Sequence, residues 1–169
     1  TAFYKLIKNP ISRIEVASAG GYLSYENIAD KATVAGVEVE VRKNLFVRPL
    51  SSAANGMNKL SFGLNGSYIY TNAKMPLATV TTGSQLEGAA PWIANFDLSH
   101  NFTKGNHSFI NTLVFNYVSD KIYTIGTQGY QDIIEQGMMT LDFVSQAKLN
   151  KYVSLLSLIH ISEPTRQEA

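Results

Sequence analysis

Apolar and polar residues alternate along several segments of this chain, most clearly in residues 59–70 (KLSFGLNGSYIY). One set of alternate positions holds Leu60, Phe62, Leu64, Tyr68 and Tyr70, and the other holds Ser61, Gly63, Asn65 and Ser67. Because successive side chains of a β-strand point to opposite faces, this pattern predicts a strand with one apolar and one polar face.

Six segments and the start of a seventh follow this pattern. They are residues 1–7, 33–42, 60–70, 92–102, 108–118 and 139–149, with the seventh beginning at Tyr152. Between them we expect a long loop with a short hairpin at 11–30, punctuated by Gly20 and Gly21, and a polar turn region at 46–57. Further connections are long loops at 71–89 and 119–137, a tight turn at 104–106 and a short turn at Asn150 and Lys151.

The connections alternate between long and shorter, and this is typical of outer-membrane barrels, which have long extracellular loops and short periplasmic turns. The loops that start near Pro10, Thr71 and Ser119 are predicted to face outside, and the turns near Ser51, Gly105 and Asn150 to face the periplasm. The predicted fold is therefore all-β, with antiparallel up-and-down strands forming part of a transmembrane outer-membrane β-barrel. Seven strands leave open edges, which cost several kcal/mol per unpaired backbone group in lipid, so we expect an incomplete barrel.

The composition excludes some classes of protein. The 169 residues carry a net charge of +1, which gives no electrostatic case for a nucleic-acid partner. The chain has no cysteine, so disulfides and thiol chemistry are excluded. No apolar run approaches the ~18 residues of a membrane-spanning helix, but barrel strands conceal their lipid-facing residues at every second position.

The alternation assigns candidate residues to each face and to the strand ends. The candidates for a polar, lumen-facing lining are Glu38, Glu40, Arg42, Asn65, Asn95, Asp97, Asp142, Gln146 and Lys148. The candidates for aromatic residues at the membrane interface are Tyr68, Tyr70, Trp92 and Tyr117. Glu38 and Glu40 are ~7 Å apart along a strand, and we interpret them with Arg42 as a charged interior ladder rather than as an acid–base pair.

No catalytic, metal-binding or cofactor-binding constellation emerges from the sequence. His100, His107 and His160 are isolated from other ligating residues and are interpreted as interface or surface histidines. Ser61 lacks the Gly-x-Ser-x-Gly context of a nucleophile, and Gly20-Gly21 lacks the lysine of a phosphate loop. The sequence therefore predicts a protein that is not an enzyme and binds no cofactor.

Short segments in a fixed order resemble the C-terminal barrel region of TonB-dependent outer-membrane receptors, especially those of the Bacteroidota. They are Phe3-Tyr4-Lys5 with Asn9-Pro10-Ile11, then Tyr25, Asn27, Lys31-Ala32 and Gly36-Val37-Glu38-Val39-Glu40, then Pro91-Trp92-Ile93-Ala94-Asn95 with Asp97-Leu98, then Asn116-Tyr117, Asp120-Lys121-Ile122-Tyr123, Gly126, Asp132, Glu135-Gln136 and Leu141-Asp142. Each segment is short and degenerate, and their order and spacing carry the resemblance. Lys121 stands where the family often has arginine.

The resemblance implies uptake of a nutrient across the outer membrane, with an iron chelate, a cofactor or a glycan as ligand. Its expected partners are outer-membrane lipid, the nutrient ligand and the inner-membrane TonB complex, which the family reaches through a plug that this chain lacks. The loops at 12–30, 72–90 and 120–137 are expected to contribute to ligand capture. Residues 1–156 are predicted to be an incomplete barrel segment, and residues 157–169, which depart from the pattern, a non-native tail.

Two other classes of function stay open on the sequence alone. One is a passive porin-type barrel of a different family. The other is a soluble β-sandwich that binds a ligand, in which the apolar face would be buried in a sandwich core and the tyrosine and tryptophan residues at loop junctions would form a sugar platform.

Overall fold

The computed structural model describes residues 1–15, 22–50, 56–74, 85–126 and 131–162, and every regular element in these ranges is a β-strand. The strands are β1 (Ala2–Lys8), β2 (Ile11–Glu15), β3 (Leu23–Asn27), β4 (Lys31–Leu50), β5 (Gly56–Ala73), β6 (Trp92–Lys104), β7 (His107–Val118), β8 (Lys121–Thr124), β9 (Ile133–Glu135), β10 (Met138–Lys148) and β11 (Ser154–Ser162). No helix in the described ranges is long and apolar enough to cross a membrane.

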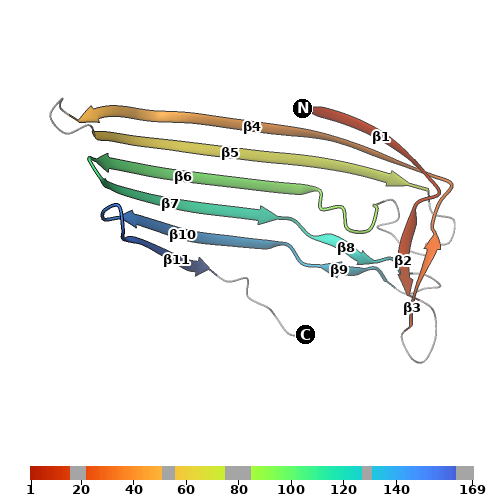
Figure 1. The fold of residues 1–169 in the computed structure, drawn as a ribbon. Coiled ribbons are helices and arrows are strands. Elements are labelled where there is room, and N and C mark those ends of the chain that lie inside the picture. Colours follow the sequence, from red (N-terminus) through yellow and green to blue (C-terminus); the bar gives the residue numbers. More distant parts are fainter. Residues whose placement is uncertain (16–21, 51–55, 75–84, 127–130, 163–169) are drawn as a thin grey trace. The chain divides into compact units, whose positions relative to one another are not determined.

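Seven of these strands form one sheet in the order β1-β4-β5-β6-β7-β10-β11 (Figure 1). β1 pairs antiparallel with β4 from Ala2↔Val37 to Lys8↔Lys31, and β10 pairs antiparallel with β11. The sheet is not closed, because β1 and β11 are its edges and do not pair with each other. The predicted all-β class, the antiparallel up-and-down order and the seven long strands are confirmed.

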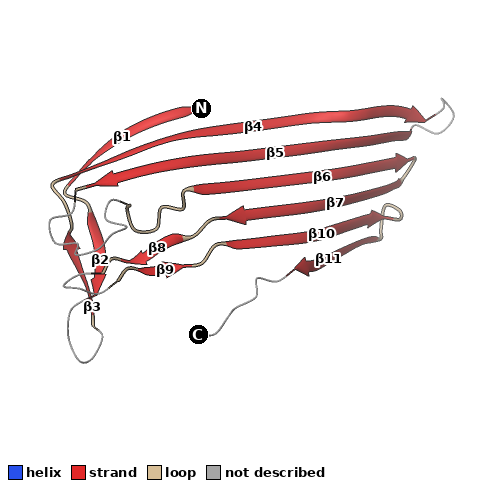
Figure 2. Cartoon of the chain, turned by 180° about the vertical axis from the view of Figure 1, so that it is seen from behind, coloured by secondary structure: helices blue, strands red, loops and turns tan. Residues whose placement is uncertain are grey.

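Two short hairpins are inserted between strands of the large sheet (Figure 2). β2 pairs with β3 inside the connection from β1 to β4, as the sequence predicted, and β8 pairs with β9 inside the connection from β7 to β10. The second hairpin was not predicted. Its strands have four and three residues, which is too short for a period of two to be visible in the sequence.

The prediction of a polar turn region at 46–57 was wrong at both ends. β4 continues to Leu50 and β5 begins at Gly56, while residues 51–55 lie outside the described ranges. Leu45 and Val47 extend the exposed face that Val39 and Val41 begin, and no residue before Pro49 interrupts the strand. The alternation therefore persists beyond the point at which polar composition suggested a turn.

Other predicted features lie partly or wholly outside the described ranges. Gly20 and Gly21, the middle of the loop at 71–89, residues 127–130 and the end of the tail at 163–169 are among them. The predicted tight turn at Gly105 and Asn106 is confirmed, and Gly105 adopts the positive φ of 59° that favours glycine. Residues 157–162 continue β11 and pair with β10.

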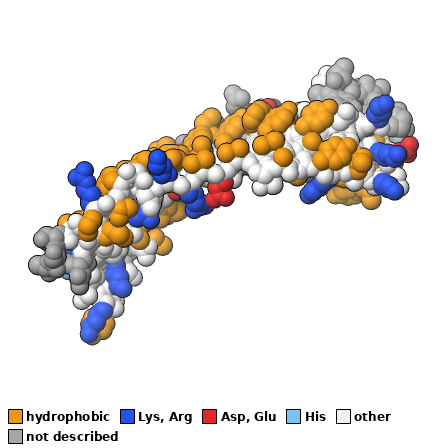
Figure 3. Space-filling view, turned by 90° about the horizontal axis from the view of Figure 1, so that it is seen from above, with side chains coloured by type: hydrophobic (Ala, Val, Ile, Leu, Met, Phe, Trp, Pro, Cys, Tyr) orange, Lys and Arg blue, Asp and Glu red, His pale blue; other side chains and the backbone are white. Residues whose placement is uncertain are grey.

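The chain divides into two compact units, each assembled from three stretches of sequence. The first, which we call the loop unit, contains Thr1–Glu38, Ser67–Ile93 and Val118–Met138, and the second, which we call the turn unit, contains Val39–Gly66, Ala94–Tyr117 and Met139–Ala169. Figure 3 shows hydrophobic side chains gathered along one face of the strands. We call that side of the sheet the apolar face and the opposite side, which carries Glu40, Asn65 and Asn95, the polar face.

Candidate functional site

The three long connections pack against one another in the loop unit around a common apolar core. Its buried residues are Ile14, Ile28, Ala29, Ala32, Ala73, Ile122 and Ile125, and Leu86 packs against them. They come from the β1–β4, β5–β6 and β7–β10 connections and the strand ends beside them. Burial of apolar side chains drives this association at ~25 cal/mol per Å², so the loops form a folded body.

Backbone hydrogen bonds join the same three connections. Ile14 and Ile125 form a parallel bridge, and the Ile125 N–H donates to the Arg13 carbonyl at 3.1 Å. The Gly88 N–H donates to the Ile122 carbonyl at 2.8 Å, which joins the β5–β6 connection to β8. These bonds fix the alignment of the loops, because each satisfies polar groups that burial would otherwise leave unpaired.

Arg13 lies at the junction of all three connections. Its guanidinium is 4.5 Å from the ring centroid of Tyr123 and 5.8 Å from that of Tyr25, both within the range of cation–π attraction. Its backbone N–H donates to the Glu87 carboxylate, which also lies 3.8 Å from its Nε. Hydrogen bonding to Tyr25 raises the pKa of Arg13, so the guanidinium stays protonated at every physiological pH.

Aromatic rings are exposed around this arginine. The side chain of Tyr25 is 66% exposed and that of Tyr123 is 45% exposed, although both contact Arg13. Tyr22 is exposed beside β3. Exposed rings held by a fixed cation form a surface that can stack on a planar or sugar-like ligand, because their positions are set before the ligand arrives.

The four predicted interface aromatics all lie exposed on their strands. Tyr68 and Trp92 are in contact, with ring centroids 4.5 Å apart and a tilt of 44°, while Tyr70 and Tyr117 are each partly exposed. The backbone N–H of Trp92 donates to Ser119 Oγ at 3.0 Å, and the backbone N–H of Ser119 donates to the Trp92 carbonyl. Their position at a membrane interface stays a prediction.

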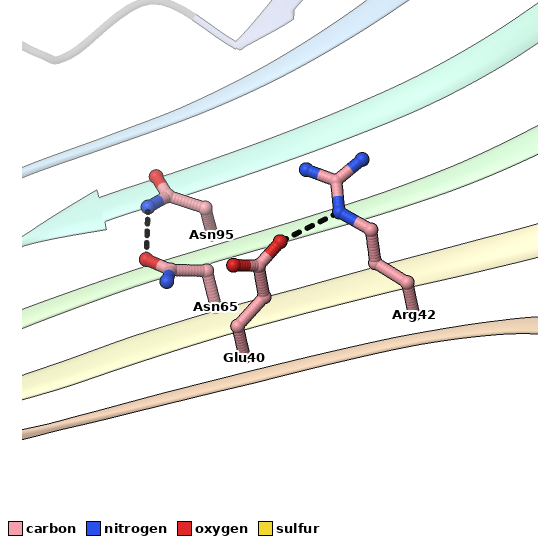
Figure 4. Close-up of polar contacts among 4 residues, drawn as sticks. All are labelled: Glu40, Arg42, Asn65 and Asn95. Carbon is pink, nitrogen blue, oxygen red and sulfur yellow. Dashed lines mark hydrogen bonds and ion pairs between the residues drawn. The ribbon is translucent and has the colours of Figure 1, made fainter. Parts of the chain in front are cut away.

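Five of the nine predicted lumen-facing residues line one pocket on the polar face of the turn unit. They are Glu40, Arg42, Asn65, Asn95 and Asp97, and the pocket has a volume of about 320 Å³. Arg42 Nε donates to Glu40 Oε1 at 2.7 Å, and Asn95 Nδ2 donates to Asn65 Oδ1 at 3.3 Å (Figure 4). This grouping offers both donors and acceptors, with two carboxylates and one guanidinium.

The absence of a side chain at Gly63 makes room for Asp97. A Cβ at Gly63 would overlap the carboxylate of Asp97, so alanine there would displace that carboxylate from the pocket. We expect Gly63→Ala to destabilise the folded protein by about 1–3 kcal/mol, the usual cost of overpacking. The measurement is the unfolding midpoint of the purified protein in unboiled gel samples, with Ser61→Ala on the same strand face as the control.

A second substitution tests the cause of that expected loss. If the clash with Asp97 is responsible, Gly63→Ala combined with Asp97→Ala regains most of the stability that Gly63→Ala alone loses. An equal loss with and without the Asp97 carboxylate contradicts this reading of the pocket.

The other four predicted lumen residues lie apart from this pocket. Glu38 falls in the loop unit, where its backbone pairs with Thr1 at the start of the chain. Asp142 contacts His160 on β11, and Lys148 lines a pocket at the turns beside Lys151. Gln146 lies on β10, two residues before Lys148, and does not line the pocket. Alternation assigned a face to each residue, but not the register between strands that decides which residues meet.

Two polar pairs on the apolar face were not anticipated. His100 Nε2 lies 2.8 Å from Asn58 Oδ1, and Ser145 Oγ donates to Asn111 Oδ1 at 2.7 Å. His100 and Asn111 are equally far along their strands from the Gly105 turn, so the two pairs lie in a row across β5, β6, β7 and β10. In the sequence, each of these four strands carries a polar residue at one of the alternate positions that otherwise hold apolar residues, and this was the available signal for the row.

Among the described residues, no group of three or more histidine, cysteine, aspartate or glutamate side chains is arranged to hold a metal ion. The cluster around Arg13 and the pocket around Arg42 present amide, carboxylate and guanidinium groups, which suit hydrogen bonding to a polar ligand. The geometry therefore offers two kinds of surface: an aromatic and cationic one on the loop unit, and a mixed-charge one on the turn unit.

Comparison with known proteins identifies the family. Residues 1–157 match the family model described as TonB dependent receptor-like, beta-barrel. The chain belongs to this family. No curated protein and no solved structure matches it. The resemblance to TonB-dependent receptors is thereby confirmed, and the unclosed antiparallel sheet is the fold expected of part of such a barrel. Membership in this family places the chain among outer-membrane receptors and transporters, and opposes the soluble sandwich and the unrelated porin-type barrel.

Proposed function

We propose that this chain forms part of an outer-membrane receptor whose three long connections capture a nutrient ligand on the cell exterior and whose barrel admits it. The observation that carries the proposal is the shared apolar core of those connections, together with the family match. The shared core fixes these connections relative to one another, and a binding surface gains affinity when its parts are fixed in advance.

The orientation of the sheet follows from the lengths of its connections. The long connections lie in the loop unit and the short Gly105–Asn106 turn lies in the turn unit. Since outer-membrane barrels have long extracellular loops and short periplasmic turns, we place the loop unit outside the cell. The polar face then lines the lumen, and the apolar face contacts lipid.

Import would proceed in the way that the family implies. A plug in the complete receptor would couple to the inner-membrane TonB complex, and the polar face would provide side chains that the plug and the passing ligand contact. The pocket formed by Glu40, Arg42 and Asp97 is the strongest candidate for such a contact, because it combines charges of both signs. We propose binding and transport, and no catalysis, for this chain. An iron chelate, a cofactor and a glycan all remain candidate ligands.

Labelling of single cysteines tests the orientation, because the chain contains no cysteine of its own. We expect Tyr22→Cys in the loop unit to react with a membrane-impermeant maleimide on intact cells. Lys151→Cys, beside the short turn that follows β10, is expected to react only after the outer membrane is permeabilised. Labelling of Lys151→Cys on intact cells, with Tyr22→Cys protected, would reverse the orientation and contradict the proposal.

Uptake by cells that depend on the receptor tests the function itself. A ferric chelate, cobalamin and an oligosaccharide, each radiolabelled, are offered to cells with and without a proton uncoupler, which removes the energy source of TonB. We expect one of the three to accumulate in an energy-dependent manner, and Tyr25→Ala with Tyr123→Ala to reduce that accumulation about tenfold or more. Energy-independent entry of all three would indicate a passive pore instead.

A further inference from the structure

Two lysines face each other at the end of the β1–β4 pair that leads into the long loops. The two strands are antiparallel and lie side by side, and their register pairs Lys8 directly with Lys31 (Figure 1). Both side chains are exposed. Directly opposite side chains lie on the same face of a sheet, with Cβ atoms about 4.5–5.5 Å apart, and like charges in this position destabilise the pair. An anion between the two ammonium groups would remove that repulsion.

No carboxylate in the described part of the chain forms an ion pair with either lysine. The ion pairs of the loop unit are made by Arg13 and by Lys121. Asp30 precedes Lys31 in the sequence, but the described hydrogen bond of this residue is made by its backbone carbonyl. The loop unit therefore presents two adjacent positive charges to an anion from outside the chain.

The lysine pair lies on the apolar face of the sheet. The pairs that lead to it along the same face are Ala2↔Val37, Tyr4↔Ala35 and Leu6↔Thr33, and Tyr4, Leu6 and Val37 are exposed. Phe3 and Gly36 form a pair of the polar face, and the Phe3 ring occupies the space that a Cβ at Gly36 would need. One face of β1 and β4 therefore carries a strip of exposed apolar side chains that ends at two lysines.

β5 brings a third lysine to about the same level. Gly36 of β4 lies against β5, because a Cβ at Gly36 would come 2.8 Å from the carbonyl oxygen of Tyr68. The two strands are neighbours in the sheet, so counting from this contact toward the loops brings Lys74 to within about one residue of Lys31. Lys74 directly follows β5 and is exposed. It adds positive charge beside the lysine pair.

Aromatic side chains mark the membrane boundary below the lysines. By the same count Tyr70 of β5 lies at about the level of Tyr4, and both tyrosines are exposed. Tyrosine is enriched where the membrane meets water. Lys8 is four residues beyond Tyr4, which is ~14 Å along the strand and roughly 10 Å along the membrane normal at the usual tilt. The lysines therefore lie on the headgroup side of the tyrosines, and their flexible stems can reach back toward lipid phosphates.

We propose that Lys8 and Lys31 bind a phosphate group of an anionic lipid in the outer leaflet of the outer membrane. The phosphate would lie between the two ammonium groups, and the acyl chains would follow Tyr4, Leu6 and Val37 on the same face. A soluble anion would neutralise the lysines but leave these apolar side chains uncovered, whereas a lipid satisfies both. The proposal rests on the orientation given in the proposed function, and it adds a bound lipid that nutrient uptake does not require.

The test measures binding of diphosphoryl lipid A to the purified receptor that contains this chain. The lipid is titrated in neutral detergent, and bound molecules are counted by native mass spectrometry. We expect Lys8→Gln with Lys31→Gln to weaken binding by about fivefold for each lysine, hence roughly 25-fold together. Lys8→Arg with Lys31→Arg keeps both charges and is expected to retain binding, because guanidinium groups also hold phosphate.

The matched control is Lys5→Gln with Lys151→Gln, which removes the same amount of charge elsewhere. Lys5 is on β1 but on its other face, where its ammonium lies 5.7 Å from the ring centroid of Phe3. Lys151 lies in the short turn that follows β10. This control should bind lipid A as the wild type does. An equal loss in the control would show that binding depends only on net charge, and would overturn the proposal.

Three further results overturn the proposal. They are unchanged binding in the Lys8 and Lys31 glutamine variant, equal binding of dephosphorylated lipid A by the wild type, and full displacement of lipid A by millimolar inorganic phosphate, which would identify a site for free phosphate. If the glutamine variant does not fold, the wild type decides, because phosphate binding by exposed lysines must weaken steeply from low to high salt. A receptor that binds lipid A through this pair but imports no ligand contradicts only the proposed function.

Discussion

Ile125→Ala is expected to release the long loops from one another while leaving the large sheet folded. Ile125 is 2% exposed, packs in the core of the loop unit and forms the parallel bridge with Ile14. Removing a buried isoleucine side chain to alanine costs about 2–5 kcal/mol, because the cavity that is left relaxes only partly. This cost falls on the small core that joins the three connections, and that core has few other large residues.

Limited trypsin digestion of intact cells measures this loosening directly. Arg13 and Lys121 are cleavage sites inside the loop unit, and both are held by neighbours in the folded state through Glu87 and Glu135. We expect faster cleavage at both sites in Ile125→Ala and at least tenfold weaker ligand uptake, with an unchanged unfolding midpoint for the barrel. Opening of the loop core is a local event, so its free energy is separate from that of the sheet.

The matched control is Ile133→Ala, which removes the same atoms from the same connection at a position that is 45% exposed. This variant should be cleaved at the wild-type rate and import ligand normally. If Ile125→Ala is cleaved no faster than Ile133→Ala, the three connections are held together by something other than their shared core, and the proposed pre-formed binding surface fails.

The strands could be predicted from the sequence because alternation is a local property. β5 and β6 show it residue by residue, and the structure places Asn65 and Asn95 in contact on the face that their parity assigned. What alternation cannot provide is the register of one strand against the next. Glu38 and Glu40 share a parity, yet Glu38 lies in the loop unit beside Thr1, and Glu40 bonds Arg42 in the other unit.

The packing of the loops could not be derived in the same way. Ile14, Ile28 and Ile122 occur as isolated apolar residues in connections of polar composition, and each contact among them joins residues far apart in the sequence. Their presence was the available signal, since an apolar side chain in a loop needs a partner to be removed from water. The identity of that partner depends on the folded sheet, which brings the three connections to the same end of the strands.

The two faces of the sheet are expected to respond differently to a new positive charge. Phe96 and Asn95 are neighbours on β6 and point to opposite faces, Phe96 to the apolar face and Asn95 to the pocket with Glu40 and Asp97. An arginine on the lipid face of a barrel costs about 2–4 kcal/mol near the middle of the membrane. The same arginine on the polar face meets the carboxylates of Glu40 and Asp97, which favour its charge.

We therefore expect Phe96→Arg to prevent assembly of most of the receptor, and Asn95→Arg to assemble almost normally. Phe96→Arg also loses the burial of an aromatic ring against lipid, which adds to the cost of the charge. Assembly is measured as the fraction of outer-membrane receptor that migrates as a folded species in unboiled gel samples. Equal assembly of the two variants would mean that the apolar face does not contact lipid. The two positions are adjacent on one strand, and the main difference between them is the face to which each side chain points.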